Sequence, residues 1–177
     1  MKTREALTVL AKHRGDAIVV CALGMAANEW WAVTQSEDSF YMHGGMGFAA
    51  SFALGLATAL PRVPVWVLNS DGSLSMNLGC LLTEAGQQPA NLKHFVVDNQ
   101  RYQTVDTMPM VNQDNSDYAA IAKGAGIRQV ATIDNLADLE TRCRRSSPRR
   151  ARISSACGSN PSPNTSARRP PPMKGRR

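Results

Sequence analysis

Two short polar segments of the sequence carry the residue types of a metal–phosphate site. The first is Ser70-Asp71-Gly72-Ser73, and the second contains Asn99, 28 residues after Asp71. A carboxylate and an amide oxygen suit Mg²⁺, which keeps phosphate oxygens and water in its coordination shell. Gly72 allows the backbone to approach a phosphate, and Ser73 with the start of a following helix offers O–H and N–H donors to an anion. The residue types therefore indicate a metal-bridged diphosphate.

Both polar segments follow apolar runs that have the composition of buried strands. Residues 17–23, 63–69 and 93–98 are short, rich in Val, Leu and Ile, and bounded by glycine or polar residues. Such runs are typical of strands buried on both faces of a parallel sheet. A further short strand is expected at 129–133.

Helices are expected before, between and after these strands. Their predicted ranges are 2–12, 45–60, 75–88, 117–125 and 135–140. Strands that alternate with helices at this spacing indicate βαβ units, and hence an α/β three-layer sandwich with a parallel sheet and helices on both faces. In such a fold Asp71 and Asn99 lie at the carboxyl edge of the sheet, where open α/β sheets bind ligands.

The polar segments also carry a family resemblance. Asp71-Gly72-Ser73 followed by Asp98-Asn99-Gln100-Arg101-Tyr102 resembles the GDG…NN signature of thiamine diphosphate enzymes. Residues 40–51, which contain the run Gly44-Gly45-Met46-Gly47, resemble the segment that precedes this signature in the diphosphate-binding (PP) domain. The similarity covers residues 1 to about 140 and is strongest to the sulfopyruvate and phosphonopyruvate decarboxylases. It implies the thiamine diphosphate-binding fold.

The resemblance implies a role for each matching residue. Asp71 and the Asn99 side chain would bind Mg²⁺, with the carbonyl of Arg101 as a third ligand. Gly72 and Ser73 would hold the diphosphate. The remaining cofactor-binding positions implied by the resemblance are Gly44, Gly45, Met46 and Gly47, where Met46 would bend the cofactor and the Gly44 carbonyl would accept a hydrogen bond from its 4′-amino group.

Several positions leave simpler alternatives open. Asp71 and Gly72 alone could form an ordinary turn and helix cap, and Met46 could be a plain core residue. His43 could protonate an intermediate, since histidine titrates near neutral pH, or it could be structural. The segment 24–29 lacks the hydroxyl groups that the family usually offers to the diphosphate, which leaves Asn28 and backbone N–H groups for that purpose.

The resemblance also implies a partner. Thiamine enzymes need a pyrimidine-binding domain whose glutamate promotes cofactor activation, and only a short helix precedes the strand expected at residue 17. We therefore expect a separate α subunit to supply that glutamate. The predicted function is the diphosphate-binding subunit of a thiamine diphosphate- and Mg²⁺-dependent decarboxylase acting on a small 2-oxo acid, sulfopyruvate or phosphonopyruvate. The alternatives are a carboligase of the acetolactate synthase kind, and a non-catalytic truncated relic or binding domain.

Charge divides the chain into two parts. Residues 1–140 hold 9 Lys/Arg and all 14 Asp/Glu, whereas residues 141–177 hold 11 Lys/Arg and no acid. We predict a folded domain at 1–140 and a disordered tail at 141–177, because the tail contains no Phe, Tyr, Trp, Leu or Val with which to form a core. The tail could instead be a basic arm for RNA or an acidic partner, or the product of a reading-frame change near codon 141.

The remaining features exclude other classes. Because the net charge of +6 comes from the tail alone, we do not expect nucleic-acid binding. No apolar run reaches the roughly 20 residues of a membrane span, and the charged N-terminus does not resemble a secretory signal, so a cytoplasmic location is expected. Cys21 and Cys80 lie in apolar context and are expected to be buried thiols.

Overall fold

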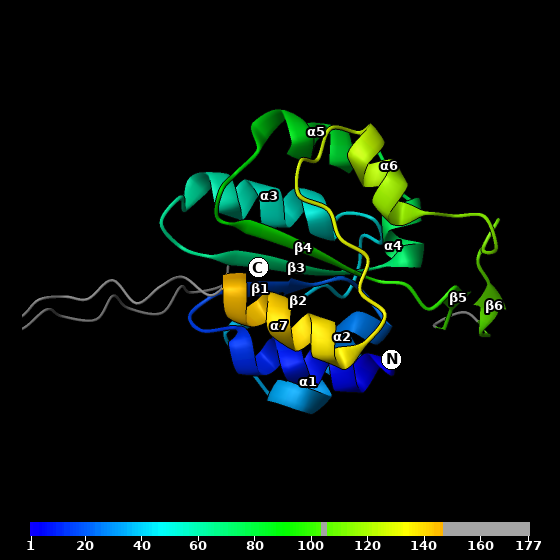
Figure 1. Ribbon diagram of the computed structural model, residues 1–177, viewed down its shortest axis with the longest axis horizontal. Helices are drawn as coiled ribbons and strands as arrows, with labels where there is room; N and C mark the ends of the chain where they lie inside the picture. The colour runs from blue at the N-terminus through cyan, green and yellow to red at the C-terminus, as the bar shows by residue number, and fades with distance from the viewer. Residues whose placement is uncertain (104–105, 147–177) are drawn as a thin grey trace, which may run out of the picture. The chain divides into compact units, whose positions relative to one another are not determined.

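Four parallel strands form the central sheet of the computed structural model, which describes residues 1–103 and 106–146 (Figure 1). The strands are β1 (Ile18–Cys21), β2 (Ser39–Tyr41), β3 (Val65–Ser70) and β4 (Leu92–Val97). Their order is β2-β1-β3-β4, so the direction in which the chain crosses the sheet reverses between β1 and β3. A separate antiparallel pair, β5 (Arg101–Tyr102) and β6 (Met108–Pro109), follows β4.

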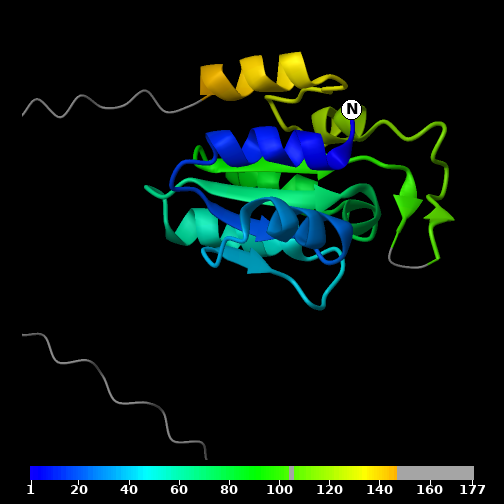
Figure 2. The same ribbon diagram turned by 90° about the horizontal axis from the view of Figure 1, so that it is seen from below.

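Helices cover both faces of this sheet. On one face lie α1 (Thr3–His13), α2 (Met25–Thr34) and α7 (Leu136–Ser146) (Figure 2). On the other lie α3 (Ala49–Ala59), α5 (Cys80–Gln87) and α6 (Tyr118–Gly124), while the short α4 (Asp71–Ser75) follows β3 directly (Figure 1). The predicted α/β sandwich with a parallel sheet is therefore confirmed.

Each face has its own apolar core. Trp30 of α2 packs with Leu7 and Leu68 beneath the first face, and the Trp30 indole N–H donates to Ser39 Oγ at 3.0 Å. On the second face the alanines of α3 pack on Val20 and other valines of β1 and β3. Small side chains let α3 lie close to the sheet, as the composition of this segment indicates. The expected burial of Cys21 and Cys80 is confirmed, and both are free thiols.

The strand expected at 129–133 is wrong. These residues form no strand and pair with no neighbour in the sheet. Val130 and Ile133 turn inward, whereas the two residues between them are exposed, so the burial does not alternate with the period of two that a strand requires. Ile133 packs against the core as part of the connection to α7.

The last helix extends past the predicted boundary at residue 140. Helix α7 continues to Ser146, and it buries Leu139 and Cys143, four residues apart, against the core. His13 Nε2 lies 3.0 Å from Glu140 Oε1, which joins α1 to α7. One apolar residue per helical turn is enough to dock a segment whose other face is basic. Of the tail predicted to be disordered at 141–177, residues 141–146 belong to α7, and residues 147–177 lie outside the described residues.

The helices of the described ranges are too short to cross a bilayer, since the longest of them have 11 residues.

Candidate cofactor site

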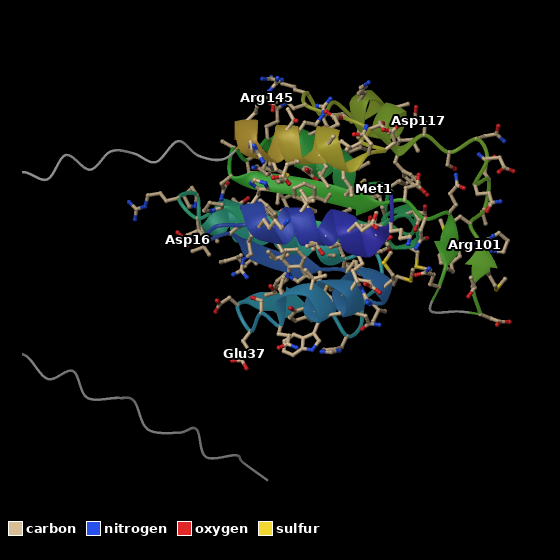
Figure 3. All side chains as sticks on the ribbon, turned by 60° about the horizontal axis from the view of Figure 1, so that its bottom comes forward. Met1, Asp16, Glu37, Arg101, Asp117 and Arg145 are labelled. Carbon is tan, nitrogen blue, oxygen red and sulfur yellow. The ribbon has the colours of Figure 1, made fainter. Side chains whose placement is uncertain are left out.

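A hollow of about 290 Å³ lies at the carboxyl ends of the strands. The chain segments that follow all four strands of the sheet line it: Leu23 and Met25 after β1, Met46 after β2, Ser70 and Gly72 at the end of β3, and Asn99, Arg101, Tyr102 and Gln103 after β4. This is the crevice expected where the strand order reverses. Figure 3 shows Arg101 beside β5, at the end of the molecule opposite Asp16, which precedes β1.

Asp71 is the buried charged group at this edge. Asp71 is only 1% exposed. The Ser70 side chain caps helix α4, which begins at Asp71. Asp71 Oδ1 accepts the Gly72 N–H at 2.7 Å, and Oδ2 accepts the N–H groups of Asn99 at 3.1 Å and Gln100 at 2.6 Å. The carboxylate therefore ties the end of β4 to the turn after β3, bringing the two predicted segments together.

Burial raises the pKa of Asp71 above its usual range, while its backbone hydrogen bonds oppose this shift. Among the described residues its hydrogen-bond donors are all neutral N–H groups, and the nearest charge that affects it is another carboxylate, Asp98. A buried carboxylate without a positive partner is costly. A divalent cation would neutralise it.

Asn99 and Arg101 stand next to this carboxylate. Both line the hollow, and the Asn99 side-chain oxygen accepts the Arg101 N–H at 3.0 Å. This bond turns the backbone sharply after β4. One carboxylate, one amide oxygen and nearby carbonyl groups form an all-oxygen donor set of the kind that Mg²⁺ prefers. The residues present thus fit a Mg²⁺ ion.

The glycine run after β2 is held against the turn after β3. Gly45 and Gly47 have φ values of +68° and +91°, which favour glycine. The Gly47 N–H donates to Ser73 Oγ at 3.1 Å, and Asn77 Nδ2 donates to the Gly47 carbonyl at 3.1 Å. Ser73 therefore links the two motif segments, and it is 1% exposed.

Close packing at Gly72 shows why a glycine stands there. A Cβ at this position would lie 2.7 Å from Cε1 of Tyr102 and 3.4 Å from Cε of Met46. Met46, Gly72 and Tyr102 therefore meet at one side of the hollow. Gly72 itself lines the hollow, and a side chain there would meet the Tyr102 ring.

Some predicted site residues lie elsewhere. His43, Gly44 and Gly45 are exposed in the loop between β2 and α3 and do not line the hollow. Asn28 is exposed on α2, where its backbone N–H bonds to the Gly24 carbonyl, and it does not line the hollow either. Of the predicted site residues, Met46, Gly72, Asn99 and Arg101 line the hollow. Asp71, Ser73 and Gly47 are buried behind this lining and are joined to it by hydrogen bonds.

The sequence reasoning missed other residues of the hollow. Leu23 and Met25 bring the start of α2 to it, and this helix begins at Gly24 without a side-chain cap. Uncapped N–H groups at a helix start favour an anion. The available signal was the predicted end of the first strand, because residues that follow parallel strands share one edge. Tyr102 and Gln103 follow β4 in the same way.

Comparison with known proteins decides the family. Residues 19–151 match the model of the family described as thiamine pyrophosphate enzyme, C-terminal TPP binding domain. The chain belongs to this family. The match spans all four strands of the sheet and therefore every segment that lines the hollow of this TPP-binding domain.

Curated relatives of the TPP-binding domain include decarboxylases. This chain is 40% identical over 121 residues to the sulfopyruvate decarboxylase subunit beta of Methanothermobacter thermautotrophicus, covering 68% of this chain and 64% of that protein. It is 37% identical over 131 residues to the phosphonopyruvate decarboxylase of Streptomyces viridochromogenes, covering 74% of this chain and 32% of that protein. The chain thus spans less than two thirds of the length of either relative.

Solved structures share the fold. The benzoylformate decarboxylase of Polynucleobacter necessarius superposes with a TM-score of 0.66 at 20% identity, covering 82% of this chain and 30% of that chain. A putative thiamin diphosphate-dependent enzyme from Mycobacterium smegmatis gives a TM-score of 0.67 at 23% identity, covering 82% of this chain and 29% of that chain. These similarities support the same arrangement of sheet and helices.

Proposed function

We propose that this chain is the diphosphate-binding subunit of a thiamine diphosphate- and Mg²⁺-dependent decarboxylase for a small 2-oxo acid of the sulfopyruvate or phosphonopyruvate type. The observation that carries the proposal is the buried Asp71 carboxylate beside Asn99 at the carboxyl edge of the sheet. The relatives named above are decarboxylases of these two acids, which supports the substrate class.

The residues that would hold the cofactor follow from this arrangement. Asp71, the Asn99 side-chain oxygen and the Arg101 carbonyl would bind Mg²⁺. Gly72 would let the diphosphate approach the backbone at the start of α4, and Ser73 would offer its hydroxyl group. The start of α2 supports a diphosphate site, because it has no side-chain cap and brings N–H groups to the same hollow.

The protein contributes orientation to a reaction whose difficult step belongs to the cofactor. When bound, thiamine diphosphate supplies a nucleophilic carbon for the keto group and accepts the electrons left when CO₂ departs. The Met46 side chain lines the hollow beside Gly72 and would hold the bend of the cofactor. We propose that the Gly44 carbonyl accepts a hydrogen bond from the cofactor amino group and that Gly45 and Gly47 shape this loop. His43 would donate a proton from the same loop.

A partner subunit would complete the site. Among the described residues, those that line the hollow include no glutamate. The glutamate that activates the cofactor would come from a pyrimidine-domain α subunit. The naming of one relative as a beta subunit supports this.

An uncharged surface beside the site supports the need for a partner. Residues 44–61 contain no charged side chain. In this region Phe48 is 58% exposed, and the Phe52 ring stacks on Phe40 with centroids 4.5 Å apart while both remain exposed. Exposed aromatic residues without neighbouring charges are characteristic of protein interfaces.

One observation favours the second candidate, a binding domain without turnover. The segment after β1 presents the apolar side chains of Leu23 and Met25 to the hollow, and Asn28 does not reach it. A diphosphate would therefore find only backbone donors on that side. Loss of one hydrogen bond to a charged group costs about 1.5–3 kcal/mol, which weakens binding without abolishing it.

Binding of the cofactor to the chain with its partner tests the proposal. We expect saturable binding of thiamine diphosphate that requires Mg²⁺, is lost in Asp71→Asn and is retained in Asp16→Asn, a matched change at an exposed carboxylate at the opposite end of the molecule. The complex should release CO₂ from sulfopyruvate or phosphonopyruvate. Saturable binding without turnover would favour the binding domain, and no saturable binding would refute the proposal. Turnover by the isolated chain would contradict the partner requirement.

A further inference from the structure

A chain of buried polar side chains runs from α5 through β4 to β3, outside the cofactor hollow. Glu84 of α5 is hydrogen-bonded to His94 of β4, with 2.9 Å between Glu84 Oε2 and His94 Nδ1. His94 Nε2 lies 3.3 Å from Asn69 Nδ2 on β3. The side chains of His94 and Glu84 are only 8% and 12% exposed, and Asn69 is 1% exposed. Three polar side chains in the interior require mutually consistent donors and acceptors.

The roles of the atoms in this chain can be deduced from its end at Ser70. The Ser70 backbone N–H can only donate, and it lies 3.1 Å from the Asn69 side-chain oxygen. The Asn69 amide nitrogen therefore faces His94 and donates to Nε2. Because Nε2 must accept, the proton of the neutral ring stays on Nδ1, which donates to Glu84 Oε2.

The chain of hydrogen bonds ends at the turn that presents the cofactor-binding residues. Ser70 Oγ accepts the Ser73 N–H at 3.2 Å and caps α4. Asp71 and Gly72 are the first two residues of that helix. A side chain that fixes Asn69 therefore also fixes the backbone from which the carboxylate of Asp71 projects.

We propose that Glu84 and His94 are positioning residues for the cofactor-binding turn, acting through Asn69 with His94 held in the neutral Nδ1–H form. The role of Glu84 and His94 in holding the turn does not depend on the cofactor. Their effect on cofactor binding rests on the proposed function. Without the ring, Asn69 Nδ2 has no acceptor in this chain of hydrogen bonds. The amide can then rotate away from Ser70 and release the turn.

The first test observes the ring directly. In the ¹⁵N-labelled full chain, long-range ¹H–¹⁵N spectra report which imidazole nitrogen carries the proton. We expect the Nδ1–H form for His94. His13 is an internal reference, because it faces Glu140 through Nε2 instead. A His94 ring protonated on Nε2, alone or on both nitrogens, would overturn the proposal.

The second test breaks the chain in the middle. His94→Phe keeps a ring of similar shape but removes both nitrogens, and we expect the backbone amide signals of Ser70 and Gly72 to shift. Glu84→Gln keeps an acceptor for Nδ1–H and should leave those signals in place. His13→Phe is the matched control, since it removes a histidine–glutamate pair on the other face of the sheet.

Cofactor binding then connects the turn to function. With the partner subunit present, His94→Phe should bind Mg²⁺ and thiamine diphosphate about five- to tenfold more weakly than the parent chain, the loss expected for one buried hydrogen bond. Unmoved amide signals in His94→Phe, or unchanged binding where the parent binds, would overturn the positioning role. Failure of the parent chain with its partner to bind would refute the proposed function alone, because the ring and amide signals decide the proposal without the cofactor. If His94→Phe does not fold, the parent ring spectrum still decides it.

Discussion

Replacement of Gly72 by alanine should weaken cofactor binding more than it lowers the stability of the fold. The new Cβ would lie 2.7 Å from Cε1 and 2.8 Å from Cδ1 of Tyr102, closer than side chains approach one another. Gly72 lies within α4 and has no positive φ, so alanine is compatible with its backbone. The clash therefore falls on the Tyr102 ring, which is half-buried at the short β5 and can turn. Overpacking costs about 1–3 kcal/mol, and we expect the lower limit of about 1 kcal/mol here.

The effect on the cofactor should be larger than the effect on stability. The added methyl group occupies the surface at which the diphosphate would approach the backbone, and loss of one hydrogen bond to a charged group costs about 1.5–3 kcal/mol. This corresponds to about 10- to 150-fold weaker binding. Thermal unfolding measures the first effect, and titration of the chain and its partner with thiamine diphosphate and Mg²⁺ measures the second.

Gly86→Ala is the matched control for this experiment. Gly86 lies within α5, is exposed and has no atom within 4 Å of the added Cβ. Alanine in a helix is more favourable than glycine by about 0.5–1 kcal/mol, so this variant should be slightly more stable and should bind normally. If Gly72→Ala binds the cofactor as tightly as the parent chain, the diphosphate does not lie against Gly72 and our assignment is refuted.

Three further predictions concern the core and the contacts between helices. Trp30→Ala should lower the free energy of unfolding by about 3–5 kcal/mol, measured by urea denaturation, because the fully buried indole leaves a large cavity. Burial raises the pKa of Cys21 to about 12, so a thiol reagent at pH 8 should modify Cys21 only as fast as the chain unfolds, followed by mass spectrometry. The hydrogen bond from His13 lowers the pKa of Glu140 below its usual range, so Glu140 stabilises the fold above its ordinary pKa and loses this effect as pH falls through the lowered one. Glu140→Gln should therefore lower Tm at neutral pH, and the difference should vanish in acid once the carboxyl group is protonated.

Tertiary packing decided the elements that the sequence did not indicate. Residues 129–133 have strand-like composition. Val130 and Ile133 are half-buried while the two residues between them are exposed, which is not the one-in-two alternation of a strand. The segment 24–29 was interpreted as a loop, whereas α2 begins at Met25 and buries Trp30. Helix α7 continues to Ser146 because Cys143 packs in the core. Each outcome depends on the residues against which the segment packs in the fold. The local sequence does not specify those residues.

The amino-acid sequence alone indicated the three strands β1, β3 and β4, the helices that lie between and after β3 and β4, and the position of Asp71 and Asn99 after two of these strands. Parallel strands bring their carboxyl ends to one edge, so spacing along the chain was sufficient to bring these residues together. Only the tertiary structure decided that Asp71 is buried among backbone N–H groups, that Ser73 holds the Gly47 loop and that His94 connects Glu84 to Asn69. These contacts join residues far apart in the sequence, and side-chain packing selects them.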